Sequence, residues 1–299
     1  MTDLIISLQG TADGRQVALW LALLSAFAHA LFGALQKGRF DPWVMRGGID
    51  AACAVMALPV ALFVVPWPEP QMWPVFAGAF VIHAAYKMLQ AAAYARGAYT
   101  VVYPVVRGMG PLFAVLGAGV MFGESFTWGQ WLGLATLLAG IFGLAGWNLR
   151  HVTARRDTML PALGLAVLTG GFVAAYTTYD AWAIRLPPDP FTFLAWFFVI
   201  DGLLMPVLTR QRLWALRRAD LAPFAKKAVL GALIAYISFG SMMIATRIGN
   251  VGEAAVLRET STVFAALIGW LVLGERSGVA QVALMALIAA GAVVVKLAG

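Results

Sequence analysis

Two stretches of the chain decide its fold: residues 105–124, VVRGMGPLFAVLGAGVMFGE, and residues 256–275, VLRETSTVFAALIGWLVLGE. Each is about as long as the α-helix of roughly 20 residues that crosses the hydrocarbon core of a bilayer. Each carries one arginine inside a largely apolar run and ends in Gly-Glu. A shift of 151 residues takes Arg107 to Arg258 and aligns the two Gly-Glu pairs. We therefore expect two copies of one membrane-spanning unit.

The same shift matches further residues along the chain. The matched pairs are Asp50 with Asp201, Arg96 with Arg247, Phe113 with Phe264, Gln130 with Gln281 and Gly140 with Gly291. The predicted repeats cover residues 16–147 and 159–297, with five spans in each. Because five is odd, the second repeat enters the bilayer in the opposite sense, which predicts inverted repeats.

The composition requires lipid as the solvent. Hydrophobic residues make up 62% of the chain, charged residues only 12%, and the mean hydropathy is +0.83. A soluble domain carries about a quarter charged residues. We therefore predict an all-α membrane protein with ten transmembrane helices. They are expected at residues 16–36, 43–65, 72–95, 99–121, 127–147, 159–182, 191–209, 224–246, 253–273 and 277–297.

Charge placement predicts the orientation. Most lysines and arginines outside the spans fall on the side that holds loops 148–158 and 210–227. The positive-inside rule puts these loops in the cytoplasm and both termini outside, in a multi-pass protein of the cell (inner) membrane. This placement accounts for the net charge of +7 without a nucleic-acid partner. The single cysteine, Cys53, offers neither a disulfide framework nor a cysteine-based metal site, and is expected to be packed.

The repeats resemble a known family. The first half has Tyr103-Pro104, then Gly123-Glu124, then a glycine-rich fifth span, whereas the second half has Gly274-Glu275 but Ala254-Ala255 where Tyr-Pro would stand. This pattern resembles the EamA-type repeat of the drug/metabolite transporter superfamily over residues 16–297. The resemblance implies that spans one to four and six to nine surround a central cavity. Spans five and ten would lie at the periphery, toward lipid or the second subunit of a homodimer.

Two arginines inside the spans are the strongest candidates for substrate binding. A charge at the bilayer centre costs about 2.5–3.5 kcal/mol on insertion scales, so each needs a partner or a purpose. The guanidinium fork of Arg107 or Arg258 suits a carboxylate or a phosphate. The alternative is internal neutralisation, of Arg258 by Glu259 or Asp201 and of Arg107 by Asp50.

Span three carries a polar stripe at helical spacing, which predicts a wet cavity. The stripe consists of His83, Lys87, Gln90 and Tyr94. Lys87 is a third candidate contact for an anion, and snorkelling or pairing with Glu259 is its alternative. We add Gln90, Tyr94 and Tyr103 to the substrate-binding candidates, since Tyr103 precedes Arg107 by one helical turn.

Three titratable residues are candidates for proton coupling. Asp201 has no basic residue three or four positions away, so it must find a partner on another helix or stay protonated. Glu259 is a comparable candidate. His29 changes charge near neutral pH, although a hydrogen-bonded structural role is the alternative. Neither His29 nor His83 has an acidic cluster at ligand spacing, so we predict no metal site.

Four other charged residues are interpreted as structural. Arg46 and Asp50 are four residues apart and are expected to form an ion pair within one helix. Glu124 and Glu275 end spans four and nine, and are expected to cap the span that follows each of them.

These features favour a secondary transporter over an enzyme. The predicted substrate is a small organic anion or zwitterion, such as an amino acid or related metabolite, and export by alternating access is the expected direction. No P-loop appears in the sequence, so a gradient is the expected energy source. The alternative is a carrier or flippase for a lipid-linked or phosphorylated substrate. We find no acid/base constellation of a membrane enzyme, and no cofactor is predicted.

Overall fold

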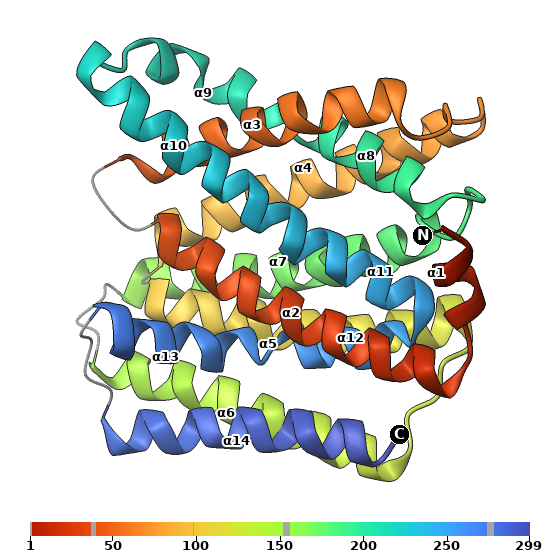
Figure 1. Ribbon diagram of the computed structural model, residues 1–299. Helices are drawn as coiled ribbons and strands as arrows, with labels where there is room; N and C mark the ends of the chain where they lie inside the picture. Colours follow the sequence, from red (N-terminus) through yellow and green to blue (C-terminus); the bar gives the residue numbers. More distant parts are fainter. Residues whose placement is uncertain (1, 37–39, 98, 152–155, 274–277) are drawn as a thin grey trace. The chain divides into compact units, whose positions relative to one another are not determined.

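The computed structural model describes residues 2–36, 40–97, 99–151, 156–273 and 278–299, and each regular element in these ranges is helical (Figure 1). The helices are α1 (Thr2–Leu8), α2 (Ala12–Gln36), α3 (Pro42–Phe63), α4 (Met72–Arg96), α5 (Tyr99–Phe122), α6 (Trp128–His151), α7 (Arg156–Ala183), α8 (Pro190–Asp201), α9 (Leu204–Trp214), α10 (Arg218–Ala235), the π-helix η1 (Tyr236–Gly240), α11 (Ser241–Ile248), α12 (Val251–Arg258), α13 (Ser261–Leu273) and α14 (Val279–Leu297).

The prediction of a multi-span helical membrane protein is confirmed. Eight helices in the described ranges are long and apolar enough to cross a bilayer. The pair α8 and α9, bent by 40°, makes a ninth where it counts as one span. Two predicted spans are interrupted: 191–209 between α8 and α9, and 253–273 between α12 and α13.

Other boundaries differ from the prediction. The span expected at 224–246 runs from Arg218 to Ile248 as α10, η1 and α11. The segment 210–227 was expected to be a loop, but it is helical except for a short turn between Trp214 and Arg218. Its charged residues extend α9 and α10 beyond the apolar parts of these helices. The short helix α1 was not predicted.

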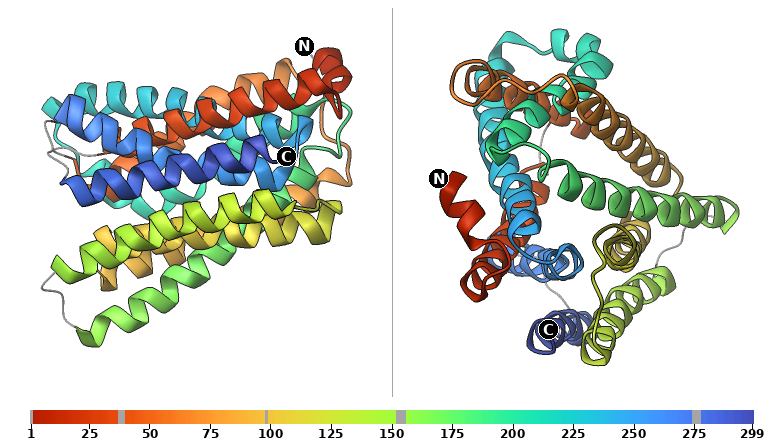
Figure 2. Two further views of the ribbon diagram at one scale, coloured as in Figure 1. Left: turned by 90° about the horizontal axis from the view of Figure 1, so that it is seen from below. Right: turned by 90° about the vertical axis from the view of Figure 1, so that its right-hand side faces the viewer.

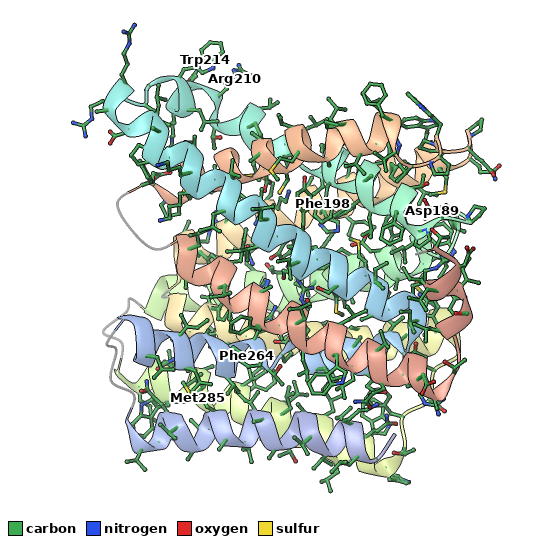
Figure 3. All side chains as sticks on the ribbon, viewed as in Figure 1. Asp189, Phe198, Arg210, Trp214, Phe264 and Met285 are labelled. Atoms are coloured by element: carbon green, nitrogen blue, oxygen red, sulfur yellow. The ribbon has the colours of Figure 1, made fainter. Side chains whose placement is uncertain are left out.

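Local sequence explains where several helices begin. Asp41 accepts hydrogen bonds from the backbone of Trp43 and Val44 at the start of α3. Asp189 does the same from Phe191 at the start of α8 (Figure 3). In both cases proline follows the aspartate, at the first helical position, where its missing N–H costs nothing.

The helices form two compact units. Unit 1 comprises Met1–Val81 and Asp180–Ile248, and unit 2 comprises Ile82–Tyr179 and Gly249–Gly299. Each unit takes helices from both halves of the sequence. The compact units therefore differ from the two repeats predicted at 16–147 and 159–297.

In unit 1, α3 packs against α8, α9 and α10, and α2 packs against α10, η1 and α11. Met45 and Ile49 of α3 are fully buried, and Cys53 is buried in the same apolar cluster. The interruption between α8 and α9 allows a close approach to α3. A Cβ atom at Gly202 would lie 2.6 Å from the carbonyl oxygen of Asp50, so only glycine fits there.

In unit 2, α6 and α14 lie side by side (Figures 1 and 2), and α5 packs against α6 and α12. Glycines bring the backbones of α6 and α14 together: a Cβ at Gly133 would lie 2.8 Å from the carbonyl oxygen of Gly291, and one at Gly140 would lie 2.8 Å from that of Leu284. Shifting Gly133 by 151 residues gives Leu284, and Gly140 gives Gly291. The two contacts are thus copies of each other, as expected for two helices related by a two-fold axis.

The Gly-Glu pair of the first half ends α5. Gly123 has φ of +67°, in the left-handed region that favours glycine. The N–H of Glu124 bonds to the carbonyl of Ala118 at 3.4 Å, and the N–H of Gly123 bonds to that of Gly119 at 3.1 Å. These bonds close the last turn of the helix. Residues 274–277, with the second Gly-Glu pair, lie outside the described ranges.

Candidate functional site

The buried guanidinium of Arg107 is the centre of a set of polar contacts in unit 2. Its Nε lies 2.9 Å from Oε2 of Glu259, in an ion pair whose side chains are only 8% and 4% exposed. Its Nη2 donates to Oγ of Ser261 at 2.6 Å and to the carbonyl oxygen of Arg258 at 3.4 Å. One arginine on α5 is therefore held by three residues of the short segment 258–261.

Arg107 meets this segment where the ninth predicted span is interrupted. α12 ends at Arg258 and α13 begins at Ser261 (Figure 1). The N–H of Thr262 bonds to the carbonyl of Glu259 at 3.1 Å instead of to that of Arg258, as it would in an uninterrupted α-helix. The carbonyl of Arg258 is thereby available to the guanidinium of Arg107. A backbone acceptor inside a membrane needs such a partner, so Arg107 stabilises the interruption.

The structure brings the two repeat-related arginines together and settles the partner of one. Arg107 contacts the backbone of Arg258, and its counter-ion is Glu259. The sequence offers Asp50 as the partner of Arg107, whereas the ion pair of Arg107 in unit 2 is made with Glu259. Asp50 instead pairs with Arg46 on the same helix at 2.7 Å, as their spacing predicted. Glu259 also interacts electrostatically with Arg258.

Aromatic and polar side chains of α4 and α7 contact one another, and two of their tyrosines interact with Arg107. The amide of Gln90 donates to the hydroxyl of Tyr86 at 2.9 Å. The ring of Tyr176 on α7 lies 5.1 Å from that of Tyr86 and 4.6 Å from that of His83, between ring centres. The hydroxyls of Tyr86 and Tyr176 interact electrostatically with Arg107. Of the stripe on span three, His83 thus contacts Tyr176 on α7, and Gln90 bonds to Tyr86 on its own helix.

The remaining substrate-binding candidates also belong to unit 2. Tyr103 interacts electrostatically with Arg107, Glu259 and Arg258. Lys87 is buried on α4. Tyr94 packs against a small apolar cluster of α4, α5 and α7 residues, which is a structural contact.

The other two proton-coupling candidates belong to unit 1. Asp201 is the last residue of α8, directly before the interruption. His29 is half-buried on α2, one turn after Ser25. The hydroxyl of Ser25 donates to the carbonyl of Ser238 in η1 at 2.6 Å, and the hydroxyl of Ser238 donates back at 3.3 Å. Within the described ranges, no three His, Cys, Asp or Glu side chains gather in a way that could hold a metal ion.

Sequence reasoning missed Tyr86 and Ser261. Tyr86 follows His83 by three residues and precedes Gln90 by four, so it belongs to the same face as the predicted stripe. Ser261 lies in the run Arg-Glu-Thr-Ser-Thr, residues 258–262, inside an apolar span. Five consecutive polar residues at this depth would have been the signal for an interrupted helix.

Glu124 has a capping role, but on a different helix from the predicted one. Its Oε1 accepts from the N–H of Val251 at 2.6 Å and its Oε2 from the N–H of Gly252 at 2.9 Å, at the start of α12. The helix that follows it, α6, is capped by Thr127 and Gln130, whose side chains each accept from the other's N–H at 3.2 and 2.9 Å. The side chain of Glu124 is therefore not needed at α6 and caps α12 instead. Glu275 lies outside the described residues.

Comparison with known proteins agrees with this architecture. The model of the EamA-like transporter family matches residues 16–146 and again residues 160–297. No curated protein matches the chain. Among solved structures, the crystal structure of one other protein is similar with a TM-score of 0.77 and 19% sequence identity, and the match covers 96% of this chain and 99% of the other. This likeness concerns the fold alone.

Proposed function

Since the chain belongs to the EamA-like transporter family, we propose that it is a gradient-driven secondary transporter that exports a small organic anion or zwitterion, such as an amino acid or related metabolite, by alternating access. The protein is a multi-pass membrane protein. We place it in the cell (inner) membrane, with the basic segments 148–158 and 210–227 on the cytoplasmic side.

One observation carries the proposal: a buried arginine faces an interrupted membrane helix. Transporters bind substrates near such interruptions, where backbone groups and helix ends are exposed to the ligand. The Nε and Nη2 atoms of Arg107 form a donor edge that matches a carboxylate. We propose that Arg107 holds the acidic group of the substrate. Arg258 and Lys87 would add positive charge, and Tyr103, Gln90 and Tyr94 would contact the rest of the substrate.

Proton coupling is the proposed energy source. Glu259 is the leading carrier because it contacts the proposed substrate-binding arginine directly. Asp201 and His29 in unit 1 are further candidates. A homodimer through α6 and α14 is also proposed, on the ground that spans five and ten lie at the periphery in the family that the chain resembles.

Thermal stability of the detergent-purified protein tests the anion site. A ligand that binds only the folded state stabilises it by about 2.7 kcal/mol at 100 times its dissociation constant. We would screen amino acids, organic acids, phosphorylated metabolites and sugars against the wild type, Arg107→Ala and Arg46→Ala. Arg46 is a matched control because it is an intramembrane arginine with its own ion pair in unit 1.

The expected result is a carboxylate or phosphate compound that raises the melting temperature of the wild type and of Arg46→Ala but not of Arg107→Ala. Uptake of that compound into proteoliposomes, driven by an imposed proton gradient, then tests transport. Stabilisation only by neutral or cationic compounds, undiminished in Arg107→Ala, would refute the anion site. A response confined to lipid-linked phosphates would favour a lipid carrier.

A further inference from the structure

The donor edge of Arg107 is already occupied in the structure. Nε faces Glu259 at 2.9 Å, and Nη2 donates to Ser261 at 2.6 Å. A carboxylate that binds a guanidinium through two hydrogen bonds uses either the Nε and Nη2 edge or the edge formed by both Nη atoms. Both edges include Nη2. An incoming carboxylate that takes the Nε edge must therefore replace the carboxylate of Glu259.

Displacement leaves Glu259 in a demanding environment. Its side chain is 4% exposed, contacts Arg107 at 2.9 Å and interacts electrostatically with Tyr103 on α5 and Arg258 on α12. Breaking a buried ion pair by taking one partner away is strongly unfavourable, because the remaining charge keeps its desolvation cost. A simple anion thus forms an ion pair with Arg107 but breaks the ion pair that Glu259 made with it.

A ligand that carries an ammonium group beside its carboxylate avoids this loss. Its carboxylate takes the place of Glu259 at Arg107, and its ammonium takes the place of Arg107 at Glu259. The single ion pair between Arg107 and Glu259 is then replaced by two: Arg107 with the ligand carboxylate, and Glu259 with the ligand ammonium group. Because a zwitterion has no net charge, the net charge of the site does not change. Arg258 interacts with Glu259 in both situations and lowers the cost of displacing it, but only the ligand's ammonium replaces the contact that Glu259 loses.

We propose that Glu259 is a specificity-determining residue, an internal counter-ion of Arg107 that makes the site select a zwitterion over the corresponding anion. This proposal rests on the proposed function and deepens it. Specificity arises here because a simple anion leaves the buried carboxylate of Glu259 without its ion-pair partner. Such a penalty separates two ligands more strongly than the mere lack of one favourable contact.

Matched ligand pairs test the proposal. Each pair consists of an amino acid and the acid that lacks its amino group: alanine with propanoate, leucine with 4-methylpentanoate, and phenylalanine with 3-phenylpropanoate. Affinities would be measured by thermal stabilisation of the wild type, Glu259→Gln and Glu253→Gln. Glu253 is the matched control, because it is a largely buried glutamate on α12, the helix directly before Glu259, and its ion pair, 2.9 Å long, is made with Lys296.

The expected ratio in the wild type and in Glu253→Gln is at least about tenfold in favour of the amino acid for any pair that binds. In Glu259→Gln the ratio falls to one or reverses, because the anion no longer displaces a carboxylate. Equal affinities within a pair in the wild type overturn the proposal, even where Glu259→Gln does not fold. An unchanged ratio in Glu259→Gln also overturns it, while binding that is lost in Arg107→Ala leaves the anion site standing. If no carboxylate binds the wild type or either variant, the proposed function itself fails.

Discussion

Replacing Glu124 with alanine removes both acceptors that hold the start of α12. The carboxylate of Glu124 accepts from the N–H groups of Val251 and Gly252 at 2.6 and 2.9 Å. Asn250, the residue at the N-cap of α12, makes no capping bond with its own side chain. Because all residues from Val251 to Arg258 are buried, water has little access to the two freed donors.

The expected cost follows from these contacts. A lost cap costs about 1 kcal/mol, and a hydrogen bond to a charged group contributes about 1.5–3 kcal/mol. Two bonds to one carboxylate at a buried helix start should together be worth about 2–4 kcal/mol. For a chain of this size we expect the melting temperature to fall by about 5–10 °C. Glu124→Gln keeps one acceptor and loses the charge, so its loss should be about half as large.

The assay is thermal unfolding of the purified protein in detergent. Glu69→Ala serves as the control, because Glu69 is an exposed acid whose side chain accepts a hydrogen bond from the side chain of the equally exposed Gln71. A change within about 0.5 kcal/mol is expected for it. The reasoning would be refuted if Glu124→Ala melted at the same temperature as Glu69→Ala or higher. It would also be refuted if Glu124→Gln melted at a lower temperature than Glu124→Ala.

Two glycines give further predictions, each checked by the same melting experiment. Gly123→Ala places a side chain at φ of +67° and should cost about 1–2 kcal/mol, whereas Gly146→Ala, in α6 with open space around its Cβ position, should be neutral or slightly stabilising. Gly291→Ala would put a methyl group 2.6 Å from the carbonyl oxygen of Gly133, so it should separate α6 from α14 and cost at least about 2 kcal/mol. Gly33→Ala should not lower the stability, because nothing lies near its Cβ position. Equal melting temperatures of Gly291→Ala and Gly33→Ala would contradict the packing argument.

Hydropathy and residue spacing could predict most of the helices but not their interruptions. A window of apolar residues averages over a local break, so the span at 253–273 was expected to be continuous. The interruption depends on which carbonyls find another donor, and the donor for Arg258 comes from Arg107, far away in the sequence. Such a partner is fixed by how helices pack, and spacing along one helix carries no information about it.

The same reason separates the ion pairs that could be predicted from those that could not. Arg46 and Asp50 are neighbours on one helical face, so their spacing was sufficient. Arg107 and Glu259 come from opposite halves of the chain, and the sequence offered Asp50 as the partner of Arg107 and either Arg258 or Lys87 as that of Glu259. Glu124 was likewise expected to cap the next helix, because capping is usually local, but Thr127 and Gln130 already fulfil that role.

The repeat explains where the site lies, and a departure from the repeat supplies its chemistry. Shifting Glu259 back by 151 residues gives Gly108, so only the second half places a carboxylate beside the paired arginines. A Cβ atom at position 108 would lie 2.9 Å from the ring of Phe142, so a side chain there would require this ring to move. Packing of α5 against α6 therefore disfavours a matching acid in the first half. The single acid gives Arg107 one internal counter-ion, and a ligand that carries both a carboxylate and an ammonium group can replace each partner of that ion pair.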